Sequence, residues 1–103
     1  MKIAIATINK KEKSKISSRG GRAPYFLIFN ENGELIESVS NPFAVGGGGA
    51  GIAVARMLAD KKVDIVVANA IGNNMAGALE ESGIKYYEKS GIAKEVVQEV
   101  IDL

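Results

Sequence analysis

The chain has 103 residues, of which 47% are hydrophobic and 24% charged, and its formal net charge is +1. This length and balance predict one globular domain, residues 1–103, with a single core. The absence of cysteine and histidine excludes disulfides, thiolate nucleophiles, serine–histidine triads and zinc sites of thiolate or imidazole. With no apolar run near about 18 residues and no signal-peptide pattern, we expect a soluble, cytoplasmic protein without membrane contact.

The first three expected elements are strands. Residues 3–7 and 25–29 are short apolar, β-rich runs, separated by a polar loop over 9–21. The Asn-Gly pair in 30–33 predicts a hairpin turn into a third strand over 34–39. We expect the first strand to extend this antiparallel hairpin.

The second half alternates helices with strands. Residues 51–62 predict a helix whose buried face is Ile52, Ala55, Leu58 and Ala59. The continuous apolar run 64–68 is typical of a central parallel strand covered on both faces.

After this strand we expect a helix capped by Asn73 or Asn74 that runs to Glu81 and is ended by Gly83. A last strand over 84–87 follows. Ser90 is the expected cap of a final helix, whose inner stripe is Ile92, Val96, Val97, Val100 and Ile101. The order β-β-β-α-β-α-β-α predicts an α/β fold with a mixed five-stranded sheet and three helices, as in ribonuclease H-like folds. Nuclease chemistry is not expected, because the first strand carries no acid.

Charge is distributed unevenly along the chain. Residues 1–22 carry seven basic side chains against Glu12 alone, whereas residues 23–103 have a net charge of −5. Such a basic segment attracts anions, or it is simply a solvated lysine-rich loop. No aromatic residues interleave the lysines, so we do not expect nucleic acid as a partner.

Three short segments are candidates for binding an anion. Residues 46–51 are rich in glycine and run into a helix, so bare backbone N–H groups and a helix N-terminus could approach a ligand. The alternative is a flexible connecting loop. These residues match G-x-G-x-x-G literally, but the preceding strand belongs to a hairpin and the following one ends without an acid, which argues against a dinucleotide site.

The second candidate is Arg19-Gly20-Gly21-Arg22, whose guanidinium groups could bind oxyanions as a mobile lid; alternatively, Arg22 pairs with Glu31 or Glu37. The third is the loop before the second helix, where ligands bind in open α/β sheets, although an asparagine there is also a plain helix cap. Met75 is expected in the core. The predicted ligand-binding residues are Arg19, Gly21, Arg22, Gly47, Gly48, Gly49, Gly51, Gly72, Asn73 and Asn74, with no catalytic residue and no metal ligand.

The segments 21–28, 47–53 and 71–79, the last followed by Gly83-Ile84-Lys85, together resemble the dinitrogenase iron–molybdenum cofactor biosynthesis family. The resemblance covers almost the whole chain. It implies a ribonuclease H-like α/β fold and a non-enzymatic protein that binds or carries iron–sulfur-based cofactor precursors. Members that handle cofactor often read His-Phe-Gly-Arg-Ala where this chain has Arg19-Gly20-Gly21-Arg22-Ala23, so the histidine ligand is replaced by Arg19.

The leading hypothesis is therefore a non-catalytic protein that binds an anionic metal cluster, such as an iron–sulfur or iron–molybdenum cofactor precursor. Without histidine or cysteine, binding would be outer-sphere, through arginine and backbone N–H groups. A cofactor-assembly protein is the expected partner. The alternatives are a sensor of phosphate or nucleotide ligands and an adaptor that has lost cofactor binding.

Overall fold

The computed structural model describes residues 1–46 and 48–103. Its elements follow the expected order β-β-β-α-β-α-β-α, with the bounds β1 Lys2–Thr7, β2 Tyr25–Asn30, β3 Leu35–Ser40, α1 Ala50–Asp60, β4 Ile65–Ala68, α2 Asn73–Glu81, β5 Lys85–Glu88 and α3 Ala93–Ile101. Within the described ranges, no helix has both the length and the apolar character needed to cross a membrane.

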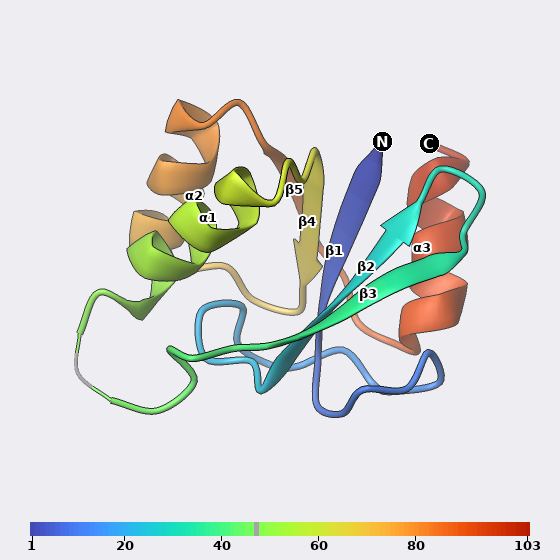
Figure 1. Ribbon diagram of the computed structural model, residues 1–103, viewed down its shortest axis with the longest axis horizontal. Helices are drawn as coiled ribbons and strands as arrows, with labels where there is room; N and C mark the ends of the chain where they lie inside the picture. The colour runs from blue at the N-terminus through green and yellow to red at the C-terminus, as the bar shows by residue number, and fades with distance from the viewer. Residues whose placement is uncertain (47) are drawn as a thin grey trace.

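The sheet is mixed, as expected, with the strand order β3-β2-β1-β4-β5. β2 pairs antiparallel with β1 and β3, whereas β4 pairs parallel with β1 and β5. The carboxyl ends of β1 and β4 therefore meet at one edge of the sheet, at the bottom of Figure 1. We call this edge the carboxyl edge.

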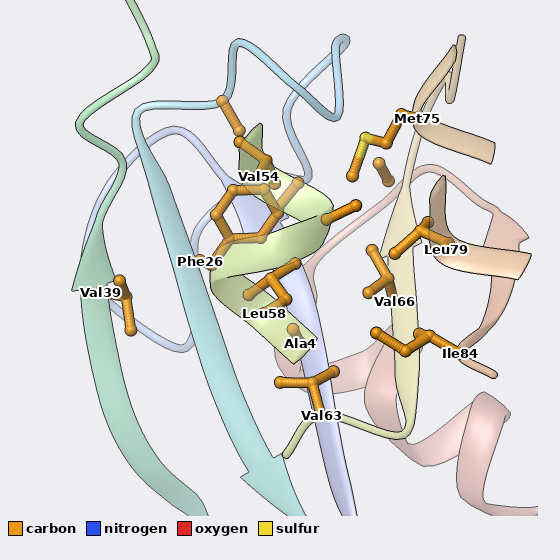
Figure 2. Packing of buried hydrophobic residues seen from close by; sticks show 14 of the residues in the cluster. Ala4, Phe26, Val39, Val54, Leu58, Val63, Val66, Met75, Leu79 and Ile84 are labelled. Carbon is orange, nitrogen blue, oxygen red and sulfur yellow. The ribbon is translucent and has the colours of Figure 1, made fainter. Parts of the chain in front are cut away.

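Helices cover both faces of the sheet. α1 and α2 lie together on one face and α3 lies on the other (Figure 1). Alternation along β1 divides its side chains between two cores: Ala4 and Ala6 belong to the core beneath α1 and α2, and Ile3 and Ile5 to the core beneath α3. Figure 2 shows Phe26 beside Val54 and Leu58 of α1 in the first core.

The buried face of α1 differs from the expected one. Ala55 and Leu58 are buried, but Ile52 is exposed and its place is taken by Ala50 and Val54. At about 100° per residue, Ile52 and Val54 point to nearly opposite sides of the helix. The inward stripe is therefore rotated by one position, and Ala59 lies at its half-buried margin.

The predicted side-chain caps are wrong. α2 begins after Gly72, which has no side chain to cap it, and Asn73 and Asn74 are the exposed first residues of the helix. The end of α2 is as expected, since Gly83 has a φ of +73°.

Ser90 does not cap α3 either, because that helix begins at Ala93, after Ile92. The carbonyls of Ser14 and Glu12 accept the N–H groups of Ala93 and Lys94, both at 2.9 Å. Backbone from a distant loop thus replaces the side-chain cap. Ile92 lies before the helix and pairs with Lys15, so Ala93 takes its place in the core beneath α3, beside Val96, Val97 and Val100.

α1 and α2 approach each other closely at Gly51. A Cβ atom added to Gly51 would lie 2.8 Å from Cβ of Met75 and 3.3 Å from both Cα and N of Met75. The missing side chain at Gly51 therefore sets the distance between the first turns of the two helices.

Replacing Phe26 by alanine should lower the free energy of unfolding by about 3–5 kcal/mol, because the fully buried ring leaves a cavity. Urea titration followed by circular dichroism measures this change. Ile36, 49% exposed on the edge strand β3, is the control, and Ile36→Ala should cost less than about 0.5 kcal/mol. Equal losses in the two variants would contradict this core.

Replacing Gly51 by alanine should destabilise the fold by about 1–3 kcal/mol, because the new methyl group overlaps Met75 and its backbone. Gly77→Ala is the matched control within α2. No atom lies within 4 Å of a Cβ at Gly77, so alanine should stabilise the exposed helix position by about 0.5–1 kcal/mol. A neutral Gly51→Ala in the same urea titration would show that the helices separate freely.

Candidate functional site

Three segments far apart in the sequence line one hollow at the carboxyl edge. It has a volume of about 460 Å³. Its walls are the loop before β2, the first turn of α1 and the first turn of α2, contributing Gly21, Arg22, Ala50, Gly51, Gly72, Asn73, Asn74 and Met75. We call it the anion hollow, after the class of ligand that the sequence predicts for its residues. Ligands of open α/β sheets bind at this end of the strands.

Backbone contacts bring these segments together. The N–H of Gly20 donates to the carbonyl of Ala70 at 2.9 Å, which ties the loop before β2 to the loop before α2. A Cβ at Gly21 would lie 3.0 Å from Cα of Gly51. Close packing of the backbone therefore explains why residues 21 and 51 are glycines. From the sequence alone, both glycines are expected only to contact a ligand.

Two helices begin at the anion hollow, and Figure 1 shows α1 and α2 side by side with their first turns at the same end. The first intrahelical bonds run from Ala53 to the carbonyl of Gly49 and from Ala76 to that of Gly72. The three N–H groups before each of these bonds have no acceptor within the helix. Neither helix has a side-chain cap or an acid in its first turn.

The positive ends of two helix dipoles therefore meet at the same hollow without a compensating carboxylate from their own first turns. Gly72 has an extended backbone, with φ −68° and ψ 161°, and a Cβ there would meet nothing within 4 Å. Neither conformation nor packing within the described residues requires glycine at this position. Its effect is to leave the N–H groups of α2 open.

Arg22 is half-buried between the anion hollow and a second hollow of about 220 Å³, which is lined also by Phe43, Val45, Gly48, Gly49, Ala50 and Ala53. Its Nη1 donates to the carbonyls of Phe43 at 3.3 Å and Gly46 at 3.1 Å. Glu37 accepts instead from Lys61 at 2.7 Å, and Glu31 from the N-terminal amine at 3.3 Å. The carboxylates considered as partners of Arg22 thus have other partners.

The predicted site residues separate into groups. Gly21, Arg22, Gly51, Gly72, Asn73 and Asn74 meet at the anion hollow, whereas Gly48 and Gly49 line the second hollow. Gly47 lies outside the described residues. Arg19 is exposed and lines neither hollow; its carbonyl accepts a hydrogen bond from the Ser17 hydroxyl at 3.1 Å.

The loop before β2 is attached to the sheet. Ser17 donates its N–H to the carbonyl of Ala6 at 2.8 Å and accepts from Asn69 at 3.2 Å, while Ile16 is 7% exposed. The lysine side chains at 10, 11, 13 and 15 remain exposed on this anchored backbone. Any lid movement of Arg19 or Arg22 is therefore confined to side chains or requires these bonds to open.

Two residues that shape the site were not predicted from the sequence. Asn41, only 7% exposed, donates through Nδ2 to the carbonyls of Gly21 and Ala23, and its Oδ1 accepts the N–H of Phe43. The Asn-Pro pair directly after β3 was the available turn signal. Glu88 accepts the N–H of Ile71 at 2.8 Å and so holds the loop before α2, for which local sequence gives no signal.

The chemistry of the anion hollow is that of hydrogen-bond donors. Met75, the expected core residue, is 2% exposed, and a Cβ at Gly20 would lie 3.1 Å from its sulfur. Across residues 1–46 and 48–103, no three acidic side chains gather closely enough to hold a metal ion. The lowered pKa of Glu31, caused by a backbone hydrogen bond and the N-terminal amine, belongs to the β2–β3 turn. In the anion hollow, backbone N–H groups and a guanidinium can bind an anion without coordinating a metal directly.

Comparison with solved structures places the chain among small proteins of the same architecture. The apo form of the orange protein from Desulfovibrio gigas has a TM-score of 0.91 and 26% identity, covering 98% of this chain and 87% of the other. A putative NifB protein from Thermotoga, described as belonging to the DUF35 family, has a TM-score of 0.82 and 29% identity, with coverage of 98% and 87%. PH0822, at 23% identity and a TM-score of 0.82, shares the fold over 99% of this chain and 91% of its own.

No curated protein matches the sequence. The family model described as "Dinitrogenase iron-molybdenum cofactor" matches residues 1–103, which is the whole length of the chain, and so confirms the resemblance seen in the three motif segments. The chain therefore belongs to the dinitrogenase iron–molybdenum cofactor family.

Proposed function

We propose that this protein is a non-catalytic binder or carrier of an anionic metal–sulfur cluster, such as an iron–sulfur or iron–molybdenum cofactor precursor, held in the anion hollow. The observation that carries the proposal is the meeting of two uncapped helix N-termini with Arg22 at one hollow. Family membership supplies the class of ligand, since the family is described by this cofactor.

The donor set supports outer-sphere binding. Thiolate and imidazole ligands are absent from the chain, so iron or molybdenum would keep its own sulfur shell while N–H and guanidinium groups contact the outer sulfur or oxygen atoms. A volume of about 460 Å³ falls within the range of small-molecule sites. The proposed contacts come first from Arg22, Gly51, Gly72, Asn73 and Asn74, with Gly21, Gly48, Gly49 and Arg19 around them.

Several finer assignments accompany this proposal. The strand order with β2 alone antiparallel to its neighbours supports a ribonuclease H-like class for the single domain 1–103. The proposed partner is a cofactor-assembly protein in the cytoplasm. A phosphate or nucleotide sensor would use the same N–H donors, so phosphate binding is the alternative to be measured beside cluster binding.

The direct test adds tetrathiomolybdate, a molybdenum–sulfur dianion, to the anaerobic protein and follows visible absorption and backbone amide shifts. We expect stoichiometric binding with shifts at Gly51, Gly72, Asn73 and Asn74. Inorganic phosphate at equal concentration is the comparison. Stronger shifts with phosphate would favour the sensor, and unchanged amides with both anions would overturn the anion hollow as a binding site.

Arg22→Ala should weaken tetrathiomolybdate binding by about 10–100-fold, because a hydrogen bond involving a charged group contributes about 1.5–3 kcal/mol. Lys94→Ala is the control. It removes one positive charge from an exposed position on α3, on the opposite face of the sheet from the anion hollow (Figure 1), and it should change the dissociation constant by less than about 3-fold. Equal losses would mean that net charge, and not the position of Arg22, governs binding.

Replacing Gly72 by aspartate should separate stability from binding. A carboxylate at the N-cap of α2 accepts hydrogen bonds from the open N–H groups and interacts favourably with the helix dipole. The free energy of unfolding should therefore rise by up to about 1 kcal/mol. The same carboxylate should repel the ligand and reduce tetrathiomolybdate binding by at least about 10-fold. The matched variant Gly72→Asn caps the helix without charge and should bind more tightly than Gly72→Asp. Undiminished binding in Gly72→Asp would place the anion elsewhere.

A further inference from the structure

Arg22 is shared between the anion hollow and the chain segment that precedes α1. Arg22 is among the residues that line the hollow, while its Nη1 donates to the carbonyls of Phe43 and Gly46. We call these two hydrogen bonds the Arg22 latch and residues 43–46 the latched segment. The guanidinium that we propose to contact the ligand is therefore already hydrogen-bonded to a loop of the chain itself.

The latched segment is held firmly at its beginning and weakly at its end. Phe43 and Ala44 donate their N–H groups to Asn41, at 2.9 and 3.3 Å. Farther along, Val45 is 90% exposed, and a Cβ at Gly46 would meet nothing within 4 Å. Among the described residues, the bond from Arg22 is the hydrogen bond found for Gly46, and none is found for Val45.

The acceptors of the latch are weak competitors for a guanidinium. Carbonyl oxygens are neutral, whereas an anion in the hollow would accept charge-assisted hydrogen bonds, which are shorter and stronger. An anion bound by the Nη1 N–H groups would draw them from Phe43 and Gly46, whereas an anion bound by Nη2 or Nε alone would leave the latch closed. The coupling therefore requires that the anion engage Nη1.

We infer that filling the anion hollow opens the Arg22 latch and releases residues 43–46, so that the exposed surface around Val45 reports whether the hollow is loaded. This coupling rests on the proposed function, because it requires an anion in that hollow. Released residues would change the wall that Phe43 and Val45 give to the second hollow. Coupling acts in both directions, so holding the segment in its released form would tighten anion binding.

The first arm of the test uses no ligand and measures backbone ¹⁵N relaxation. In Arg22→Ala, the order parameters of Val45 and Gly46 should fall below their wild-type values, to less than about 0.6, while those of Asn73 and Asn74 stay unchanged. Arg22→Lys keeps the charge but loses the planar fork, and it serves if the alanine variant does not fold. Lys94→Ala, on the opposite face of the sheet (Figure 1), should leave Val45 and Gly46 as in the wild type. Unchanged order parameters in the Arg22 variants would overturn the latch.

The second arm adds tetrathiomolybdate to the wild-type protein and to Arg22→Lys. In the wild type, shifts at Gly72 and Asn73 should be accompanied by the same fall in order parameter at Val45 and Gly46. In the variant, that fall should already be present before the anion is added. Binding at Gly72 and Asn73 with Val45 and Gly46 unaltered would overturn the coupling alone, whereas no shift at Gly72 or Asn73 would overturn the proposed function together with it.

Discussion

The candidate site depends on one close contact between backbones. Gly21, Gly51 and Met75 approach so closely that a methyl group at either glycine would collide with its neighbour. This contact sets the first turns of α1 and α2 beside the loop that carries Arg22. A larger side chain at either glycine would move a helix end away, and the N–H groups and the guanidinium would no longer share one hollow. Because Gly21 and Gly51 have no side chain, the helix N-termini and Arg22 can lie around the same hollow.

The N-termini of α1 and α2 lack the interactions that usually stabilise the start of a helix. Helix N-termini are normally stabilised by a capping side chain or an acid in the first turn, yet α1 and α2 have neither, and glycine precedes both helices. α3 lacks a side-chain cap too, but carbonyls of residues 12 and 14 satisfy its first N–H groups. The helix ends left open are therefore those that face the anion hollow.

Sequence patterns predicted the order of elements because each strand and helix has a clear period or a clear turn at its ends. They did not predict the rotation of α1, since the position of Ile52 depends on packing against α2 and the sheet. Local capping rules failed at Asn73 and Ser90, where contacts from distant residues, Glu88 to Ile71 and Ser14 to Ala93, determine the geometry around the helix starts. The position of the loop before α2 at the carboxyl edge was expected from the strand that precedes it, but Asn41, which ties Gly21 to Phe43, was not predicted.

The occupied end of α3 has a further consequence. All three helices follow strands or loops at the carboxyl edge, and each could in principle attract an anion with its dipole (Figure 1). In α3 this place is taken by the peptide oxygens of Glu12 and Ser14, in the loop that also carries the exposed Lys11, Lys13 and Lys15. Within the described residues, first-turn N–H groups that lack a backbone acceptor are thereby left at two helix starts of this edge rather than three.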